Sequence, residues 1–541
     1  MELDDEVRAW TGARRLMSTL PRGSELRRMK KAGGGRALRL RCDRSLPFEF
    51  IAEFLDPYLS LWGARAELSL SDYDPALSQL GEAAPCDVRI LFLDWRLNKL
   101  PPAQAASFIR ERAREAAREA PVLLNNWPAS HELNERLAEL RVPGLTLIDL
   151  HALKVDFDPR NDSVSNFPFS GPAAVAIARH LALDLLPPLA GERIKGVILD
   201  LDDTLWRGVL GEEGPQGIVI GEGHRALSAR LAALRKRGLM LAICSRNELE
   251  DVRAAFKLRS ELGLSLDDFA SVQVSWAPKV ENIGAIAREL NVHPSSLLFV
   301  DDNPAELAKA RGAVEGLRVL LADPDGAQTA AALDHFPGIF AVSQDAAASV
   351  RTADVRANRE REKLREQAGD PRAFLAALQM EVELFRNCAA HAQRIHELSQ
   401  KTNQFNLALQ RLSAAQAAEA VGSDQVTMTV SLRDALSESG LIGVLIARVE
   451  DGEAAVREVL FSCRVLGRDV ETLSLLHFCK WLLQEGARRI RFEVAEGPRN
   501  HPARDWLACL LPQGPSGELS ELHARLEERC RAHPATVVEH R

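Results

Sequence analysis

The stretch KGVILDLDDTLW, residues 195–206, decides the fold of the middle of the chain. Its apolar run GVIL has the composition of a strand that is buried on both faces, as in a parallel sheet. Asp200, Asp202 and Thr204 follow this run directly. Open α/β sheets bind their ligands at the carboxyl ends of the strands. The stretch therefore predicts a site rich in carboxylates at that edge of a sheet.

Three further polar elements follow, each after its own apolar run. LMLAICS ends at Ser245, and Lys279 follows FASVQVSWAP. LLFVDD then ends at Asp301 and Asp302. Any one of these elements alone would fit a helix cap or a turn equally well. Together, and in this order, they predict a single site for phosphoryl chemistry.

Phosphoryl transfer needs a nucleophile, a proton donor, groups that neutralise the phosphoryl oxygens, and a metal. We expect Asp200 to be the nucleophile, and Asp202 to protonate the leaving oxygen and later activate water. Mg2+ prefers oxygen ligands. The expected metal ligands are Asp200, the Asp202 carbonyl and Asp302, with Asp301 in support. The residues expected to bind substrate are Thr204, Ser245, Arg246, Asn247 and Lys279.

The motifs VILDLDDTLW, AICSRN and FVDDNP, with Lys279, resemble those of the haloacid dehalogenase (HAD) superfamily of phosphatases. The gaps from Thr204 to Ser245 and from Ser245 to Lys279 each have room for little more than a helix and a strand, so no cap domain is expected. An uncapped site admits a large or protein-tethered substrate. The Gly-rich loop 206–214 is expected to form a flap. There Arg207 would contact a second anionic group of the substrate or make a surface ion pair.

A second candidate site follows the run EVLFSCRVLGRDVETLSLLHF, which has the pattern of a strand, a tight loop and a helix. The R-x-x-G loop resembles the pyrophosphate loop of the N-acetyltransferase fold, and the expected pantetheine-binding residues are Arg464, Gly467 and Arg468. Arginines and a helix N-terminus activate a thiol. We therefore expect Cys463 to accept an acyl group, although a small buried apolar side chain is the alternative.

Apolar runs alternate with helical stretches over much of the chain, which predicts a multidomain α/β protein. The third domain mixes strands and helices and is expected to be α+β. The expected segments are a flexible leader (1–35), an α/β domain (36–190), a phosphatase-type domain (192–345), a helical connector (346–378), an acyltransferase-type domain (379–515) and a C-terminal helical tail (516–541).

Composition excludes several classes of protein. The chain has 541 residues, 46% of them hydrophobic, and a formal net charge of −8, so nucleic-acid binding is disfavoured. Apolar runs are far too short to span a bilayer, so no membrane partner is expected. The eight cysteines include no C-x-x-C pair. Reduced thiols and a cytoplasmic location are therefore expected.

The strings LDLDDTLWRGVLGEEG, AICSRNE, FVDDNPAEL, LSQKTNQFNL and FSCRVLGRDVE resemble the FkbH-like family of polyketide biosynthesis, over about residues 36–510. The resemblance implies an SGNH-hydrolase-like first domain, a capless HAD-like Rossmannoid second domain and a GNAT-like third domain. It also implies a glyceryl transferase and phosphatase that takes 1,3-bisphosphoglycerate and captures its glyceryl unit as an enzyme thioester. Dephosphorylation and loading onto the phosphopantetheine arm of an acyl carrier protein would follow.

The sequence departs from this family at some positions. Asp203 and Arg207 replace the usual residues of a DNTLWGG string. The first domain lacks a G-D-S block, and Ser45, Asp149 and His151 do not have hydrolase spacing, so we expect a non-catalytic scaffold. Two alternatives stay open: a Mg2+-dependent phosphatase whose third domain is only a scaffold, and a docking module for a carrier protein.

Overall fold

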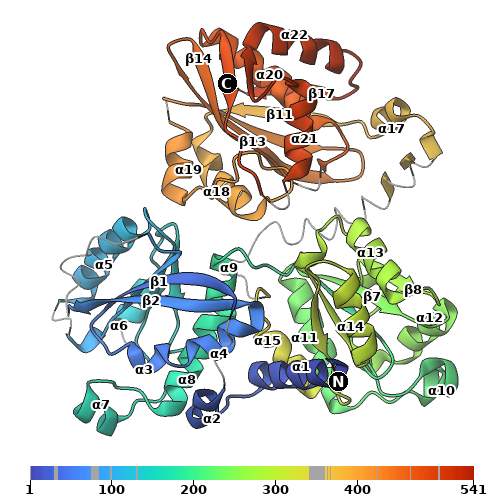
Figure 1. Cartoon of the computed structure of the whole chain (residues 1–541). Coiled ribbons are helices and arrows are strands. Elements are labelled where there is room, and N and C mark those ends of the chain that lie inside the picture. The colour runs from blue at the N-terminus through green and yellow to red at the C-terminus, as the bar shows by residue number, and fades with distance from the viewer. Residues whose placement is uncertain are drawn as a thin grey trace. The chain divides into compact units, whose positions relative to one another are not determined.

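The computed structural model has two compact units, Met1–Ala348 and Ser349–Arg541 (Figure 1). It describes the whole chain except residues 1, 30–33, 75–84, 98–99, 130–131, 340–356, 358–359, 362–363, 366, 423, 463–464, 498–499 and 541. About half of the expected connector over 346–378 therefore lies outside the described residues, and its later part contains α17 (Pro371–Ala377). Within the described part of the chain, no helix has both the length and the apolar character needed to cross a membrane.

The first sheet of unit one is parallel throughout, as its alternating apolar runs predict. Its strands are β1 (Arg36–Arg44), β2 (Ala64–Tyr73), β3 (Val88–Phe92), β4 (Val122–Asn125) and β5 (Leu145–Ile148), in the order β2-β1-β3-β4-β5. The helices around it are α3 (Glu49–Ala52), α4 (Leu55–Leu59), α5 (Pro102–Ala116), α6 (Glu132–Ala138), α7 (Pro159–Ser165), α8 (Gly171–Arg179) and α9 (Leu186–Leu189). β3 and β4 are buried at every residue, which explains their continuous apolar runs.

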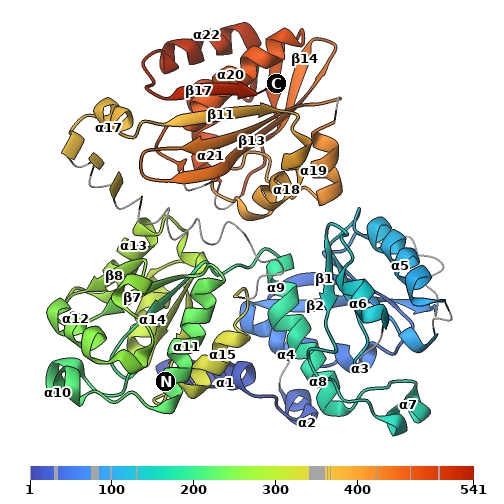
Figure 2. The ribbon, with the colours of Figure 1, turned by 180° about the vertical axis from the view of Figure 1, so that it is seen from behind.

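The second sheet of unit one is also parallel throughout. Its strands are β6 (Gly196–Leu199), β7 (Met240–Ser245), β8 (Ser271–Val274), β9 (Leu297–Asp301) and β10 (Arg318–Leu321), in the order β10-β9-β6-β7-β8. Its helices are α10 (Leu210–Gly217), α11 (Glu222–Lys236), α12 (Leu249–Leu258), α13 (Lys279–Glu289), α14 (Pro304–Ala313) and α15 (Ala327–Asp334). Figure 2 shows this second sheet with its helices from behind. Side chains of both sheets belong to one continuous hydrophobic cluster.

Residues 2–29 are largely helical, which differs from the flexible leader expected over residues 1–35. They form α1 (Glu2–Ser18) and α2 (Gly23–Arg28), and α1 packs against α15 and β10. Trp10, Arg14 and Met17 form the buried face of α1, and Arg14 Nη1 donates a hydrogen bond to the Leu321 carbonyl at 2.7 Å. Because Arg14 interrupts the apolar residues of this face, the sequence does not show a clear helical periodicity here.

Unit two contains a mixed sheet. Its strands are β11 (Glu381–Arg386), β12 (Val426–Arg433), β13 (Glu438–Glu450), β14 (Glu453–Phe461), β15 (Arg489–Phe492), β16 (Ser516–Glu518) and β17 (Thr536–His540), in the order β16-β15-β14-β13-β12-β11-β17. The helices are α17 (Pro371–Ala377), α18 (Ala392–Lys401), α19 (Ala414–Ala420), α20 (Val470–Gln484), α21 (His501–Leu510) and α22 (Leu519–Cys530). This combination is α+β, as the sequence pattern predicts.

The C-terminal segment over residues 516–540 contains an expected helix, α22, but it also adds the strands β16 and β17 to the sheet, so it is part of unit two and not a separate helical tail. β16 pairs with β15, and β17 pairs in parallel with β11. Glu539 of β17 accepts hydrogen bonds from Trp481 Nε1 at 3.1 Å and from His477, both on α20. The sequence TVVEH is too short to show a periodicity of its own, and its long-range partners determine its structure.

Candidate active site

The candidate site lies at the carboxyl edge of the second sheet of unit one, where the strand order reverses. β6 lies between β9 and β7, so the chain runs to one side through β7 and β8 and to the other through β9 and β10. Asp200 directly follows β6, and Asp301 is the last residue of β9. Open α/β sheets bind their ligands at this kind of crevice. The local apolar runs of the sequence thus explain why these carboxylates meet.

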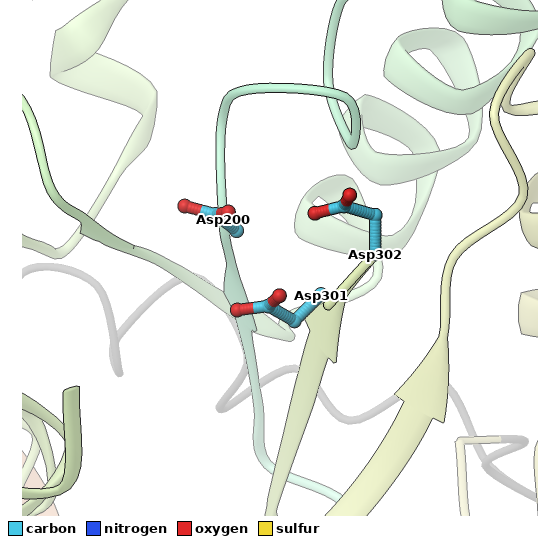
Figure 3. A group of neighbouring side chains, drawn as sticks. All are labelled: Asp200, Asp301 and Asp302. Atoms are coloured by element: carbon cyan, nitrogen blue, oxygen red, sulfur yellow. The ribbon is translucent and has the colours of Figure 1, made fainter. Parts of the chain in front are cut away.

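Three carboxylates gather at this edge. Asp200, Asp301 and Asp302 each offer an oxygen, and these oxygens lie within 4.8 Å of one another (Figure 3). Asp200 is 6% exposed and Asp301 is fully buried, whereas Asp302 is partly exposed. A compact set of carboxylate oxygens with one side open to solvent fits the ligand preference of Mg2+. Asp301 therefore belongs to the group more closely than the sequence indicated.

Lys279 balances part of this negative charge. It is the first residue of α13, is 5% exposed, and its Nζ lies 2.9 Å from Asp200 Oδ2 and 2.6 Å from Asp301 Oδ2. Burial acts to lower the pKa of Lys279, but the two carboxylates outweigh it and raise that pKa above its usual value. Lys279 is therefore a permanent positive charge in the site.

Without a bound metal ion, two of the carboxyl groups have pKa values above the usual value for aspartate. Burial, and then the charge of Asp200, raise the pKa of Asp301 to about 7 and that of Asp302 to about 6. A bound divalent cation would favour the ionised forms instead. Binding of a divalent cation would therefore be coupled to the loss of protons from Asp301 and Asp302.

The carboxylate of Asp202 lies outside this cluster of oxygens. Trp206 Nε1 and the backbone N–H of Leu210 donate hydrogen bonds to its Oδ1, and Asn247 Nδ2 donates to its Oδ2. Burial, with a contribution from Asp200, raises the pKa of Asp202 in spite of these hydrogen bonds. A carboxyl group that has a raised pKa and is fixed in place suits a general acid and base.

Ser245 and Asn247 lie at the end of β7 and in the loop that follows it. Ser245 is the last residue of β7 and is 1% exposed, and Asn247 Nδ2 lies 3.2 Å from its Oγ and 3.0 Å from Asp202 Oδ2. Arg246 is exposed, with Nη2 3.5 Å from Glu306 Oε1. Of the expected substrate-binding residues on this loop, Asn247 contacts both Asp202 and Ser245, and Arg246 lies at the surface.

Thr204 differs from its expected role as a substrate-binding residue. Its side chain is fully buried, and its Oγ1 accepts a hydrogen bond from the backbone N–H of Asp302 at 3.1 Å. The adjacent Asp203 has a left-handed backbone (φ 51°) and accepts a hydrogen bond from the backbone N–H of Gly208. Thr204 therefore holds the loop that carries Asp302, rather than offering a group to a ligand.

The site has no additional domain over it among described residues 192–339. Between β6 and β7 the chain forms only α10 and α11, and between β7 and β8 it forms α12 and short 3-10 turns. Arg207, on the segment that leads to α10, is exposed and pairs through its backbone with Val219.

The expected acyl-accepting site in unit two is only partly described. Cys463 and Arg464 lie outside the described residues. Gly467 is exposed and has a φ of 82° in the loop before α20. Arg468 is 3% exposed, and its Nη1 donates a hydrogen bond to Asp434 Oδ2 at 2.8 Å. The guanidinium of Arg468 is therefore buried in an ion pair within the domain, and its expected role in binding the pantetheine phosphates stays a prediction.

The string LSQKTNQFNL, which the resemblance singled out, lies against β14. The backbone N–H of Phe461 donates to the Phe405 carbonyl at 2.9 Å, and that of Leu407 donates to the Val459 carbonyl at 3.0 Å. Phe405 is 3% exposed. These contacts account for part of the string by packing within unit two.

The first sheet of unit one does not bring a hydrolase triad together. Ser45 Oγ accepts a hydrogen bond from the backbone N–H of Asp94 at 2.6 Å. Asp149 Oδ1 accepts from Asn126 Nδ2 at 2.7 Å, and His151 Nδ1 lies 2.7 Å from the Pro128 carbonyl. Each of the three side chains thus has a separate local partner.

Trp206 is the residue of this site that the sequence analysis missed. It was expected only as part of a flap, yet it is fully buried and bonds the expected general acid. Its spacing of four residues after Asp202 was a visible signal, because a turn that directs a strand into a helix brings such residues together. The same spacing is also found where a tryptophan only packs in the core, so the spacing alone does not identify the hydrogen bond to Asp202.

Comparison with known proteins gives the following results. No family model matches the chain, and no curated protein matches it significantly. The N-terminal part of BF1531 from Bacteroides fragilis, which contains a phosphatase domain complexed with Mg, is similar at 21% identity and a TM-score of 0.45, over 58% of this chain and 97% of that one. A Streptomyces avermitilis protein described as a HAD family hydrolase is similar at 22% identity and a TM-score of 0.20, over 27% and 93%. A fungal GCN5-related glucosamine N-acetyltransferase region is similar at 10% identity and a TM-score of 0.18, over 86% and 60%.

Proposed function

We propose that unit one is a Mg2+-dependent phosphatase of the HAD type that works through an aspartyl-phosphate on Asp200. The observation that carries this proposal is the meeting of the Asp200, Asp301 and Asp302 carboxylates with the ammonium of Lys279 at the carboxyl ends of β6 and β9. Such a site neutralises a phosphoryl group while it presents a carboxylate nucleophile.

Each side chain has a role in this proposal. Asp200 attacks phosphorus, the bond from phosphorus to the leaving oxygen breaks, and that oxygen takes a proton from Asp202. Water then attacks the aspartyl-phosphate and gives its proton to Asp202, which releases inorganic phosphate and regenerates Asp200. Asp200, Asp301 and Asp302 would hold Mg2+, which when bound would supply positive charge to offset that of the phosphoryl oxygens.

Ser245 and Lys279 bind the phosphoryl oxygens in the proposed reaction. Ser245 Oγ lies within hydrogen-bond distance of the amide of Asn247, which leaves the hydroxyl proton free to be donated to substrate. Lys279 adds a charge that stays positive. Both groups act as fixed donors to the transition state.

For the substrate we propose the glyceryl chemistry of the FkbH-like family. Unit one would remove phosphate from a glyceryl unit derived from 1,3-bisphosphoglycerate, and Cys463 would carry that unit as a thioester before it is loaded onto an acyl carrier protein. The sequence strings support this, together with an open site that suits a protein-tethered substrate. The two alternatives remain a phosphatase with a non-catalytic second unit and a docking module.

The phosphatase proposal is tested by phosphate release from phenyl phosphate with Mg2+ or EDTA present. We expect Mg2+-dependent release that Asp200→Asn abolishes. The matched control is Asp267→Asn, because Asp267 is an exposed carboxylate of the same unit. Equal release by Asp200→Asn and the native protein would refute the proposal.

The glyceryl proposal needs its own test. The protein is incubated with Mg2+, freshly generated 1,3-bisphosphoglycerate and phosphopantetheinylated carrier protein, and intact masses are measured. We expect a glyceryl adduct on the carrier that Cys463→Ala abolishes. Phosphate release without any acylated protein would instead support the plain phosphatase.

A further inference from the structure

The hydrogen bonds to Asp202 are unequally shared between its two oxygens. Oδ1 accepts from Trp206 Nε1 at 3.0 Å and from the backbone N–H of Leu210 at 3.2 Å. Among the described residues, the one donor to Oδ2 is Asn247 Nδ2, at 3.0 Å. A carboxylate oxygen accepts about two hydrogen bonds. Oδ1 is therefore fully used, and Oδ2 keeps a free position.

The indole that holds Oδ1 is itself fixed. Trp206 is fully buried, and its ring packs edge-on against Phe256 with centroids 5.9 Å apart. Phe256 belongs to α12, the helix that begins just after the loop carrying Asn247. The indole can therefore hardly turn without repacking this helix. The two side-chain donors to Asp202 are thus tied to the same helix.

We propose that Trp206 is a positioning residue, which fixes Asp202 so that Oδ2 alone exchanges a proton with the leaving group and with water. A buried indole N–H needs an acceptor, so simple satisfaction of the indole is the competing explanation. Under this competing explanation, the hydrogen bond from Trp206 to Asp202 would have no effect on the reaction rate. This inference rests on the proposed phosphatase function and adds to it a residue that acts through the general acid.

The position of Asp202 matters in both proton transfers of the reaction. When Asp200 attacks, the electron pair of the breaking bond goes to the leaving oxygen, and the proton on Asp202 Oδ2 neutralises it. In the second step the Oδ2 carboxylate takes one proton from the attacking water. Without the indole, Asp202 can rotate, and its proton is less often directed at the leaving oxygen.

The test depends on the leaving group. An alkoxide is a poor leaving group and needs the proton from Asp202, whereas p-nitrophenolate leaves readily without one. We expect Trp206→Phe to reduce kcat for glycerol 3-phosphate about 10- to 100-fold more than for p-nitrophenyl phosphate, with little change in KM. Trp276→Phe is the matched control, because the exposed indole of Trp276 donates to Glu248 and not to Asp202.

A second variant covers the case in which Trp206→Phe folds poorly. Replacing Trp206 by β-(3-benzothienyl)alanine retains the two-ring shape and removes only the N–H. The same selective loss on the alkyl substrate supports the inference. A loss by equal factors on both substrates, or no loss in a folded variant, overturns it. If the native protein hydrolyses neither substrate with Mg2+ present, the proposed function itself fails, and the inference falls with it.

Discussion

The Nζ of Lys279 lies 2.9 Å from Asp200 Oδ2 in a buried position at the carboxyl edge of the second sheet. The same ammonium lies 2.6 Å from Asp301 Oδ2. One lysine thus offsets two carboxylates that the ends of two neighbouring strands force together. The balance of charge in this cluster leads to the first predictions.

Removing the lysine should destabilise the fold in a way that Mg2+ corrects. Lys279→Met leaves two buried carboxylates without their cation, a loss of about 3–5 kcal/mol for a buried pair. We expect a lower Tm in EDTA and a larger rise in Tm on addition of Mg2+ than the native protein shows. Thermal unfolding with and without Mg2+ measures both. An unchanged Tm in EDTA would contradict the account.

Asp302 should contribute to metal binding independently of turnover. At a Mg2+ concentration 100 times Kd, a bound ion stabilises a protein by about 2.7 kcal/mol. We expect Asp302→Asn to lose most of this stabilisation, as measured by thermal unfolding during a Mg2+ titration. Asp203→Asn is the control, because Asp203 lies outside the cluster and its amide can still accept the hydrogen bond from Gly208. Equal behaviour of the two variants would argue against a metal site here.

Affinity for Mg2+ should rise with pH. The pKa of Asp302 is about 6 and that of Asp301 about 7, so below these values protons compete with the ion. Without metal the sign for stability is opposite: both groups keep their protons longer in the folded state, so their contribution is lost as pH rises to about 7. Isothermal titration with Mg2+ at pH 5.5 and pH 8 should give the tighter Kd at pH 8. A Kd independent of pH would contradict the assignment.

A buried carboxyl group in unit two should make stability depend on pH. Glu471, in the first turn of α20, is 8% exposed, and among the described residues its Oε2 has no hydrogen-bond partner. Burial raises its pKa to about 7, so its contribution is present below pH 4.5 and is lost as pH rises through 7. Glu471→Gln should stabilise the protein by about 1–3 kcal/mol at pH 8 and have little effect at pH 5. Urea unfolding at both values checks this, with the exposed Glu419→Gln as control.

Arg468 should stabilise unit two rather than bind a carrier. Its guanidinium and that of Arg361 both pair with the buried Asp434, and the two arginines lower the pKa of Asp434. We expect Arg468→Met to cost about 3–5 kcal/mol in urea unfolding, whereas Arg448→Met, at an exposed pair, costs less than about 1 kcal/mol. Unchanged stability with weakened carrier binding would instead support a role of Arg468 in binding the pantetheine phosphates.

The sequence explains for a physical reason why carboxylates gather at one edge of the second sheet. Short apolar runs mark buried parallel strands, and the carboxyl ends of such strands share one edge, so Asp200, Asp301 and Lys279 could be brought together from their order alone. Nothing in those runs states which oxygen each side chain contacts. The hydrogen bond from Trp206 to Asp202 depends on the exact turn after β6 and on the packing of α12, which local patterns do not encode.

At the two ends of the chain, too, the local sequence does not predict the structure. Arg14 interrupts the apolar face of α1, and its partner is a carbonyl of β10, more than 300 residues away. The short strand β17 gains its structure from β11 and from Glu539, which bonds to α20. Arg468 is a candidate phosphate ligand in the sequence, because its partner Asp434 is distant along the chain. In each case a long-range partner decides the structure.

The central claim is tested most directly by looking for phosphate on Asp200. The protein is mixed with Mg2+ and p-nitrophenyl phosphate, whose leaving group needs no proton from Asp202. The mixture is quenched in acid within a turnover, treated with borohydride, and mapped by peptide mass spectrometry. The account predicts homoserine at position 200, in a larger amount in Asp202→Asn, where water is no longer activated. Phosphate release with aspartate unmodified at position 200 in both proteins would contradict it.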